Sequence, residues 1–305
     1  MSFRLNTKIA FAGLGIAALA LSACSSSTSS SGGSESPSAV PSVSANETLA
    51  AKVPADIRST GKLEFGTDAS YAPSEFLAED GTTIVGFDVD LGNAIAQKLG
   101  LQGNWTAAQF DSIIVGVQSG KYNAGMSSFT INAEREKQVN MVSYFDAGTM
   151  WAVPTGNPGG VTVEDPCGKN IAVQKATVQA EEIEATDKKC QADGKAAINI
   201  QPYNLQSDAT TAVVSGKSDA MLADSPVTAY AIQQSGGKLE QLGDIYGTAP
   251  YGVVVAKDQT EFADAISGAI NELIADGTYQ QILDNWGVGS GAISKSVVNP
   301  PVTES

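Results

Sequence analysis

Two segments of the sequence share one pattern, and each is followed by polar side chains that can contact a ligand. Residues 119–124 (SGKYNA) are echoed 96 positions later by residues 215–220 (SGKSDA). Each copy is typical of a helix end followed by a strand, and the next apolar stretch reaches Ser128 in the first copy and Asp224 in the second. Because ligands of open α/β sheets bind beyond the carboxyl ends of strands, two such units facing each other would place one polar group on each side of a cleft. The alternative is a chance match, since Ser-Gly-Lys is a common helix end.

The side chains that the sequence lacks limit the chemistry further. The 305 residues include no histidine, which excludes Ser-His-Asp and Cys-His catalysis and histidine-ligated metal sites. Acidic side chains number 33 against 18 basic ones, so the formal net charge is −15 and a nucleic-acid partner is not expected. We expect no cofactor, no metal and no catalytic residue.

The first 23 residues are typical of a secretory signal peptide. Two basic residues precede an apolar run of 13 residues, which is shorter than the roughly 20 residues that span a bilayer. The run ends in the motif LSAC at residues 21–24, which resembles a bacterial lipoprotein lipobox. This resemblance implies cleavage before Cys24 and attachment of lipid to its sulfur and amine; the alternative is a cysteine within a membrane helix. Residues 24–52 begin with a Ser-, Gly- and Pro-rich stretch that cannot bury a core, so we predict a flexible tether there.

Cys167 and Cys190 are the two cysteines that remain. Outside the cytosol, such a pair favours a disulfide. A zinc site is disfavoured because two thiolates without histidine make an incomplete ligand set. We therefore predict a disulfide between Cys167 and Cys190.

Strand and helix signals alternate along the rest of the chain, which is typical of the α/β class. The clearest are a strand at 62–66, an amphipathic helix at 88–99, a helix capped by Asp111, helices that begin at Thr260 and Thr278, and a loose tail at 289–305. The length suits two domains or one domain with two lobes, and 42% hydrophobic residues suffice for a sizeable core.

Several short motifs follow one another in a characteristic order. They are GTDASYAPSEF (66–76), VGFDVDL (85–91), QSGK (118–121), TINAER (130–135), IAVQ (171–174), ADSP (223–226), PYGV (250–253), ADGTY (275–279) and WG (286–287). In this order and spacing they resemble the extracellular solute-binding protein family 3, the receptors of bacterial amino-acid ABC importers, over about residues 60–288. The resemblance implies a periplasmic-binding-protein-like fold of type II, in which two crossover strands join two α/β lobes and the ligand lies between them.

The resemblance also implies how the chain is divided. Lobe 1 comprises residues 53–147 and 252–305, with a disordered tail from about residue 289, and lobe 2 comprises residues 148–251. The last helices would thus return to the first lobe.

The residues that match the family's ligand-binding positions carry opposite charges for the two ends of a free amino acid. Arg135 is implied as a clamp for the α-carboxylate, to which a guanidinium donates two parallel hydrogen bonds. Asp224, on the opposite lobe, is implied as the partner of the α-ammonium group. Ser128 and Thr130 match positions that contact these α-groups through backbone and hydroxyl. Without the resemblance, Arg135 would be interpreted as a surface arginine and Asp224 as part of a turn before Pro226.

Other matching positions surround the rest of the ligand. Tyr71 and Phe110 match aromatic walls on either side of its aliphatic part. Asp68 matches a position that contacts the ligand side chain in some relatives and caps a turn in others, and both roles stay open. Gln174 and Thr177 lie where a strand meets a helix, whose backbone N–H groups can receive an acidic or amide side chain.

Together the resemblance implies a receptor without enzymatic activity. It would be a lipid-anchored monomer at the outer face of the cell membrane that binds a polar amino acid and delivers it to the permease of an ABC importer, which works with a cytoplasmic ATPase. Two alternatives stay open: a dehydratase of the cyclohexadienyl type on the same fold, and a sensor domain that signals through a separate membrane protein. Because no unperturbed side chain titrates between about pH 6 and 8, binding should be nearly independent of pH in that range.

Overall fold

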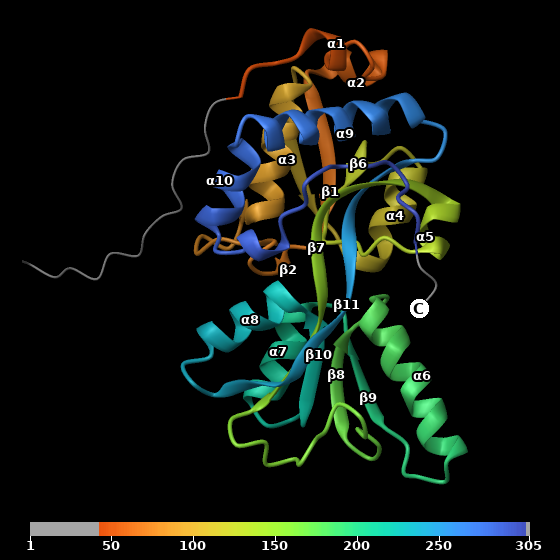
Figure 1. Ribbon diagram of the computed structural model, residues 1–305, viewed down its shortest axis with the longest axis vertical. Coiled ribbons are helices and arrows are strands. Elements are labelled where there is room, and N and C mark those ends of the chain that lie inside the picture. Colours follow the sequence, from red (N-terminus) through yellow and green to blue (C-terminus); the bar gives the residue numbers. More distant parts are fainter. Residues whose placement is uncertain (1–42, 303–305) are drawn as a thin grey trace, which may run out of the picture. The chain divides into compact units, whose positions relative to one another are not determined.

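The computed structural model describes residues 43–302 of the chain (Figure 1). The predicted signal peptide, the lipobox with Cys24 and most of the predicted tether lie outside these residues. In the part that is described, no helix combines the length and the apolar character needed to cross a bilayer.

Eleven strands and ten α-helices make up residues 43–302. The strands are β1 (Lys62–Thr67), β2 (Ser70–Tyr71), β3 (Glu75–Leu77), β4 (Ile84–Val85), β5 (Gln102–Ala107), β6 (Ala124–Gly125), β7 (Val139–Pro154), β8 (Asn170–Gln174), β9 (Asn199–Tyr203), β10 (Ala220–Asp224) and β11 (Leu239–Ala256). The helices are α1 (Glu47–Ala50), α2 (Ala55–Thr60), α3 (Phe87–Lys98), α4 (Phe110–Gln118), α5 (Ala133–Gln138), α6 (Val178–Ala192), α7 (Gln206–Val214), α8 (Ser225–Gln234), α9 (Thr260–Ala275) and α10 (Thr278–Asn285), followed by the 3₁₀ turn η1 (Gly289–Gly291).

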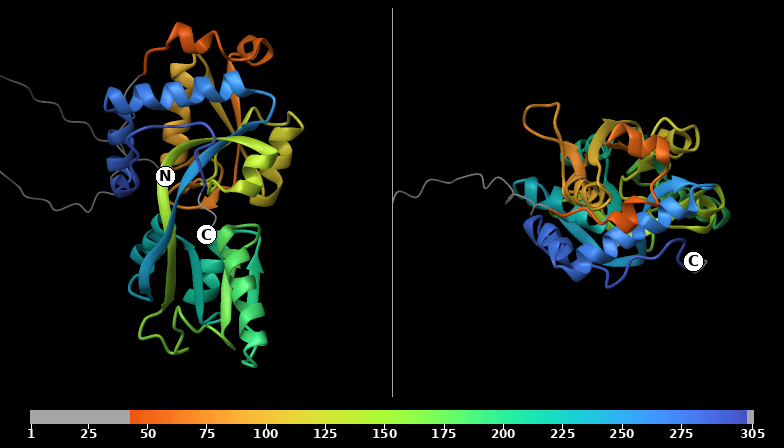
Figure 2. Two further views of the ribbon diagram at one scale, coloured as in Figure 1. Left: turned by 45° about the vertical axis from the view of Figure 1, so that its right-hand side comes forward. Right: turned by 90° about the horizontal axis from the view of Figure 1, so that it is seen from above.

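Two long strands join two α/β halves. The main sheet has the order β5-β1-β6-β11-β7-β10-β8-β9, and a small second sheet contains β2, β3 and β4. Strands β7 and β11 pair antiparallel along most of their length and pass from the half with β1, β5 and β6 to the half with β8, β9 and β10 (Figures 1 and 2). Each half has its own buried apolar clusters. This is the predicted α/β class with two lobes and two crossover strands; the residue at which each lobe begins stays a prediction.

The repeated sequence segments adopt the same local structure. Ser119 and Ser215 end α4 and α7, and the glycine after each has a left-handed φ of +75° and +74°, which glycine adopts without the cost of a Cβ. The equivalent polar side chains of the two copies also form equivalent contacts. Asn123 accepts a hydrogen bond from the Glu64 N–H, and Asp219 accepts one from the Asn170 N–H, both at 2.8 Å. The predicted repeat is therefore confirmed as a structural unit.

The helix ends agree with the sequence pattern at most places and differ at one. Helices α9 and α10 begin at Thr260 and Thr278, as predicted, and α3 is shifted by one residue. The prediction that Asp111 caps the next helix is wrong, because α4 already begins at Phe110. The first N–H of α4 instead donates to Asp68 Oδ2 (3.1 Å), a carboxylate supplied by the turn after β1.

Both segments predicted to be loose are ordered where the structure describes them. Within the predicted tether, Asn46 caps α1 through its side chain, and Leu49 packs against the larger core. In the predicted tail, Val298 forms a β-bridge with Val142, and the Ser296 hydroxyl donates to the Ser143 carbonyl (2.7 Å). The tail occupies a side of β7 that would otherwise expose unpaired backbone groups, which explains why it is held.

The predicted disulfide is present. Cys167 and Cys190 are bonded with their Cα atoms 5.7 Å apart, and Cys190 lies on α6 in the smaller half, where it is buried. The bond ties the segment before β8 to the helix that crosses it.

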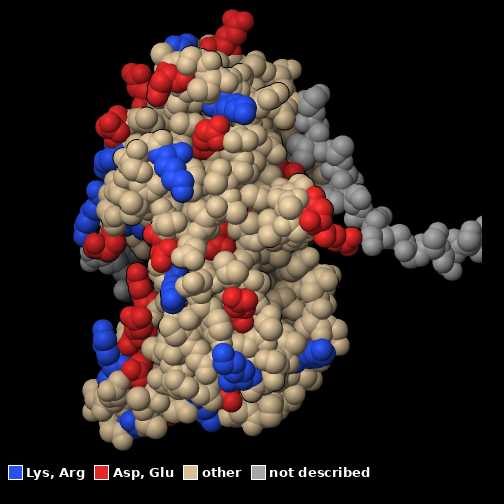
Figure 3. Space-filling view, turned by 180° about the vertical axis from the view of Figure 1, so that it is seen from behind, with Lys and Arg blue, Asp and Glu red and all other residues tan. Residues whose placement is uncertain are grey.

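Charged side chains of both signs are scattered over the one face that Figure 3 shows. Figure 3 shows one face, on which acidic and basic side chains alternate over both halves between wide uncharged areas. The mixed pattern on this face shows no concentration of one sign that would define a charged docking surface.

Replacing both disulfide cysteines tests how much this link stabilises the fold. The double variant Cys167→Ser, Cys190→Ser opens a loop with a sequence separation of 23 residues, and we expect it to lower the free energy of unfolding by about 3 kcal/mol. Urea unfolding followed by circular dichroism measures the change, with the reduced wild type as the matched control. A change below about 1 kcal/mol would show that the bond contributes little.

Candidate functional site

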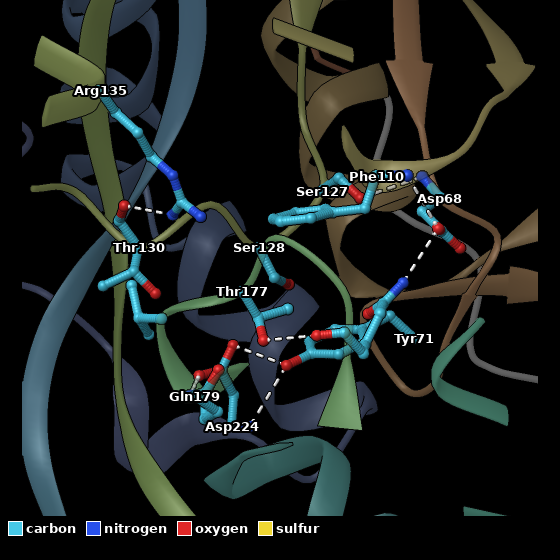
Figure 4. Close-up of a pocket in the computed structure, with 12 residues that line it drawn as sticks. Asp68, Tyr71, Phe110, Ser127, Ser128, Thr130, Arg135, Thr177, Gln179 and Asp224 are labelled. Carbon is cyan, nitrogen blue, oxygen red and sulfur yellow. Dashed lines mark hydrogen bonds between the residues drawn. The ribbon is translucent and has the colours of Figure 1, made fainter. Parts of the chain in front are cut away.

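A narrow cavity lies where the two halves meet, and its volume is about 10 Å³ (Figure 4). A space of this size holds about one water molecule, so the side chains of the two halves lie close together around it. The residues that line it are Asp68, Tyr71, Phe110, Ser127, Ser128, Thr130, Arg135, Gln174, Thr177, Val178, Gln179 and Asp224. All nine ligand-binding residues predicted from the sequence are among them, and their role in binding stays a proposal.

Strand ends and helix starts bring these residues together. Asp68 follows β1, Ser128 follows β6, Gln174 ends β8 and Asp224 ends β10. Because the carboxyl ends of these strands in both halves point to the same gap, residues more than 100 positions apart meet there. Figure 4 shows the side chains from the two halves pointing toward one another.

Arg135 lies at the inner wall of the cavity and is only 8% exposed. Asn132 caps α5 by accepting from the Arg135 N–H (2.8 Å), which fixes the backbone there. The guanidinium donates through Nη1 to the Thr130 carbonyl (2.7 Å) and through Nη2 to the Ala176 carbonyl of the other half (3.2 Å). A guanidinium has five N–H groups, so these two bonds set its plane and leave donors for an anion. Burial lowers the pKa of Arg135, but an arginine keeps its charge in proteins.

Two aromatic rings support this cation. Phe110 stacks on Phe129 with ring centroids 4.5 Å apart, and Arg135 Cζ lies 5.5 Å from the centroid of each ring. The negative face of an aromatic ring attracts a cation at this distance. Phe110 therefore contacts the arginine as well as forming a wall of the cavity.

The N-terminus of α6 faces the cavity beside Arg135. Thr177 caps the helix: its hydroxyl accepts from the Ala180 N–H (3.1 Å) and donates to the Gln174 carbonyl (2.8 Å). Val178 and Gln179, in the first turn, line the cavity. The positive end of this 15-residue helix and the guanidinium together favour an anionic group between them.

Asp224 lies on the opposite side and is 5% exposed. Its Oδ2 accepts from the Tyr71 hydroxyl (2.9 Å) and its Oδ1 accepts from Gln179 Nε2 (2.7 Å). Burial raises the pKa of Asp224, while these donors and the charge of Arg135 favour the ionised form. An ionised, buried carboxylate of this kind is suited to a ligand cation.

Asp68 serves the fold as well as the cavity. Its Oδ1 accepts from the Ser70 hydroxyl (2.6 Å), and its Oδ2 accepts from the Phe110 N–H and from Gln174 Nε2 (3.0 Å). It therefore caps the turn and the start of α4, which is one of the two roles left open by the sequence. Burial raises the pKa of Asp68, and the donors oppose that shift.

The Ser128 hydroxyl lines the cavity and has no hydrogen-bond partner among the described residues. Its Oγ is buried, and its backbone is left-handed with φ of 52°, a region that costs a non-glycine residue about 1–2 kcal/mol. An unpartnered buried hydroxyl at a strained position points to a ligand contact.

The sequence prediction missed Ser127, Val178 and Gln179. Ser127 precedes Ser128 at the end of the repeated unit, so the repeat itself pointed to it. Gln179 lies two residues after the cap Thr177, and the preference of ligands for the first turn of a helix is the signal that could have found it. No comparable signal singles out Val178, an ordinary apolar residue.

Side-chain hydrogen bonds across the gap hold the two halves together. Tyr71 bonds Asp224, Gln174 bonds Asp68 and the Ser70 hydroxyl accepts from the Gln206 N–H (3.1 Å). Together with the Arg135 bond to the second half, they describe lobes in contact across a cavity.

Two lobes joined by two strands, with charged side chains of both signs in the gap, define a solute-binding protein of the periplasmic type. The chain belongs to the bacterial extracellular solute-binding proteins, family 3, whose family model matches residues 63–289. It is 34% identical over 252 residues to the arginine-binding protein ArgT of Corynebacterium glutamicum, a match that covers 82% of each chain.

Solved structures of amino-acid-binding proteins are similar to this chain as well. An ancestral arginine-binding protein bound to arginine is 33% identical, with a TM-score of 0.68, and the match covers 74% of this chain and 98% of that one. An ancestral amino-acid-binding protein described as a precursor of cyclohexadienyl dehydratase is 29% identical, with a TM-score of 0.68 and coverage of 76% and 97%. These relatives are binding proteins, which supports the prediction that the chain is not an enzyme.

The cap of α6 offers a test of how the cavity is built. We expect Thr177→Ala to lower the free energy of unfolding by about 1 kcal/mol, because the Ala180 N–H loses its acceptor. Thr177→Ser keeps the hydroxyl and is the matched control, expected to unfold like the wild type. Urea unfolding of the three proteins measures the effect; equal stability of the alanine variant would mean that the cap contributes nothing.

Proposed function

We propose that the protein is an extracytoplasmic receptor that binds an amino acid with a cationic side chain, L-arginine first, between two closing lobes. The observation that carries the proposal is the set of charges around the cavity: one buried guanidinium and two carboxylates, supplied by both halves.

The guanidinium and one carboxylate suit the two α-groups of an amino acid. Arg135 and the N-terminus of α6 form an anion site for the α-carboxylate. Asp224 accepts hydrogen bonds on the far side and is placed to bind the α-ammonium group. Charge-assisted hydrogen bonds of this type are roughly twice as strong as neutral ones, and both ends of a zwitterion are matched.

The second carboxylate favours a cationic side chain. A zwitterionic ligand neutralises Arg135 and Asp224 but leaves Asp68 without an ionic partner in the cavity. A side chain with a guanidinium or ammonium group supplies that partner, and the wall of Tyr71 and Phe110 can contact its methylene groups. The sequence alone predicted a polar side chain; the three charges now favour a basic one.

Two of the similar proteins support this choice. The protein from Corynebacterium glutamicum is named for arginine, and the ancestral protein was solved with arginine bound. The same reasoning extends to delivery: membership in the family supports a permease of an ABC importer, with its ATPase, as the partner. Anchoring by lipid on Cys24 rests on the lipobox of the sequence.

Binding would close the lobes because one ligand contacts both. Arg135 and Ser128 belong to the first half, and Asp224 and Thr177 to the second. A ligand that bonds all four groups stabilises the closed arrangement by its difference in affinity for the closed and open forms.

Replacing Arg135 tests the clamp. We expect Arg135→Ala to raise the dissociation constant for L-arginine at least about 30-fold, since truncating one partner of a buried charge pair costs roughly 2–5 kcal/mol. Without ligand, the melting temperature should fall only through the loss of the hydrogen bonds to the Thr130 and Ala176 carbonyls, because no ion pair among the described residues includes Arg135.

Isothermal titration calorimetry measures the affinity, and Arg58→Ala is the control because Arg58 is exposed on α2. Wild-type affinity in Arg135→Ala would show that this residue is not the clamp.

Replacing Asp68 tests the preference for a basic side chain. Asp68→Asn keeps an acceptor oxygen and removes the charge, so we expect the affinity for L-arginine to fall about tenfold or more while the affinity for L-glutamine changes less. Measuring both ligands on one variant separates charge from general damage, which would weaken both alike. An equal loss for the two amino acids would rule out Asp68 as the side-chain partner.

A further inference from the structure

Two carboxyl groups lie directly behind the cavity without lining it. Glu75, on β3, and Asp88, in the first turn of α3, are both 0% exposed. The backbone brings them together, because the Asp88 N–H donates to the Ser74 carbonyl (3.0 Å). Acidic side chains are almost never fully buried unless they are paired, so their contacts need an explanation.

The outer oxygen of each carboxyl holds a part of the ligand cavity. Glu75 Oε1 accepts from the Ser127 hydroxyl (2.8 Å), whose oxygen in turn accepts from the Asp68 N–H (3.0 Å). Asp88 Oδ2 accepts from the Ser128 N–H (3.1 Å) and from the Tyr144 hydroxyl (2.7 Å). The pair thus reaches three residues that line the cavity.

The other two oxygens, Glu75 Oε2 and Asp88 Oδ1, are buried and receive no hydrogen bond from any residue that the structure describes. The two side chains act directly on each other, and two carboxyl groups can bond only through a hydrogen that one of them carries. Two like charges in contact and out of water cannot both persist, as in other carboxyl pairs that share a site.

Among the described residues, the groups that act most strongly on the pair include no cation, so a second negative charge has nothing to offset it. The titratable groups that act on the pair are Asp68 from the turn after β1, Tyr71 on β2 and Tyr144 on β7, all acidic or phenolic. Burial raises the pKa of Glu75 well above its usual value and raises the pKa of Asp88 to about 7. Since the two groups titrate together, these directions describe the pair.

We propose that Glu75 and Asp88 share one proton in neutral solution and that this proton-bridged pair is the positioning element that holds Ser127 and Ser128 in the ligand cavity. Ser128 needs such a support, because its left-handed backbone is unfavourable for serine and its N–H is held by Asp88 and Tyr144. The effect on ligand binding rests on the proposed function, whereas the shared proton does not.

The pair gives a protein without histidine a group that can titrate near neutral pH. A carboxyl whose pKa is raised by folding binds its proton more tightly in the folded than in the unfolded state. The pair's contribution to stability is therefore greatest in acid and falls as the pH rises from the unfolded pKa of about 4.3 toward the pKa of the folded pair, beyond which that contribution no longer changes. The expectation that binding is nearly independent of pH between about 6 and 8 applies to unperturbed side chains and stays a prediction; this pair is a perturbed group that could alter it.

Glu75→Gln is the first test, because its amide N–H replaces the shared proton permanently while its oxygen still accepts from Ser127. In the wild type without ligand, the equilibrium constant for unfolding should rise with pH between about 5 and 7 more steeply than in the variant, by about tenfold per pH unit for each proton taken up on folding. Urea unfolding at a series of pH values gives both slopes. Parallel slopes would overturn the shared proton.

Binding of L-arginine at pH 7.5, measured by titration calorimetry, tests the positioning role. We expect Glu75→Gln to stay within about threefold of the wild type and Glu75→Ala to lose about tenfold or more, because the alanine removes the acceptor of the Ser127 hydroxyl and the carboxyl partner of Asp88. Asp88→Asn is the second conservative variant, should Glu75→Gln fail to fold: its oxygen accepts from Ser128, and its amide donates to Glu75.

The outcomes separate the two proposals. If the wild type does not bind arginine, the proposed ligand is wrong, and the unfolding slopes still decide whether the proton is shared. If the wild type binds and both the amide variant and the alanine variant bind equally well, the pair does not position the cavity. If both amide variants lose binding as the alanine variant does, a neutral hydrogen-bonded pair is not what the site requires.

Discussion

The site depends on charges that are held out of water. Arg135 and Asp224 are almost fully buried, and neither belongs to an ion pair among the described residues. A buried charge is tolerated when fixed polar groups surround it, and here carbonyl oxygens serve the cation while hydroxyl and amide donors serve the anion. Since these partners come from both halves, the same hydrogen bonds stabilise the buried charges and join the two halves. A zwitterion that supplies both charges is the natural addition to such a site.

The two long strands make that contact possible. Strands β7 and β11 carry the chain between the halves, and their pairing shifts register between Leu242 and Tyr246, between Tyr246 and Ala249, and between Tyr251 and Gly252. Irregular pairing of this kind bends and twists strands locally. The shifts at Tyr246–Gly252 lie where the strands leave one half for the other, so a hinge there would let the halves move while each core keeps its packing.

The carboxyl pair behind the cavity adds a second electrostatic layer. Glu75 and Asp88 do not line the cavity, yet they hold residues that would contact a ligand directly. The residues that set the affinity for the ligand therefore need not be the ones that take up or release a proton. Ser128 links the two layers, because its backbone N–H faces Asp88 while its hydroxyl lies in the cavity wall.

Short-range patterns in the sequence determined much of this protein. The alternating strand and helix signals predicted the α/β class, and the two cysteines predicted the disulfide, because each of these patterns depends on a few neighbouring residues. The two-lobed fold and the nine residues that line the cavity were implied by the resemblance of the ordered motifs to a known family. The contacts between distant segments were decided only by the tertiary structure. Nothing near Asp68 in the sequence shows that it caps α4 in place of Asp111, and nothing in the tail shows that Val298 pairs with β7. Glu75 and Asp88 look like ordinary acidic residues in the sequence. Their protonation depends on burial and on each other, and both of those arise only when the strand, the helix and the turn pack together.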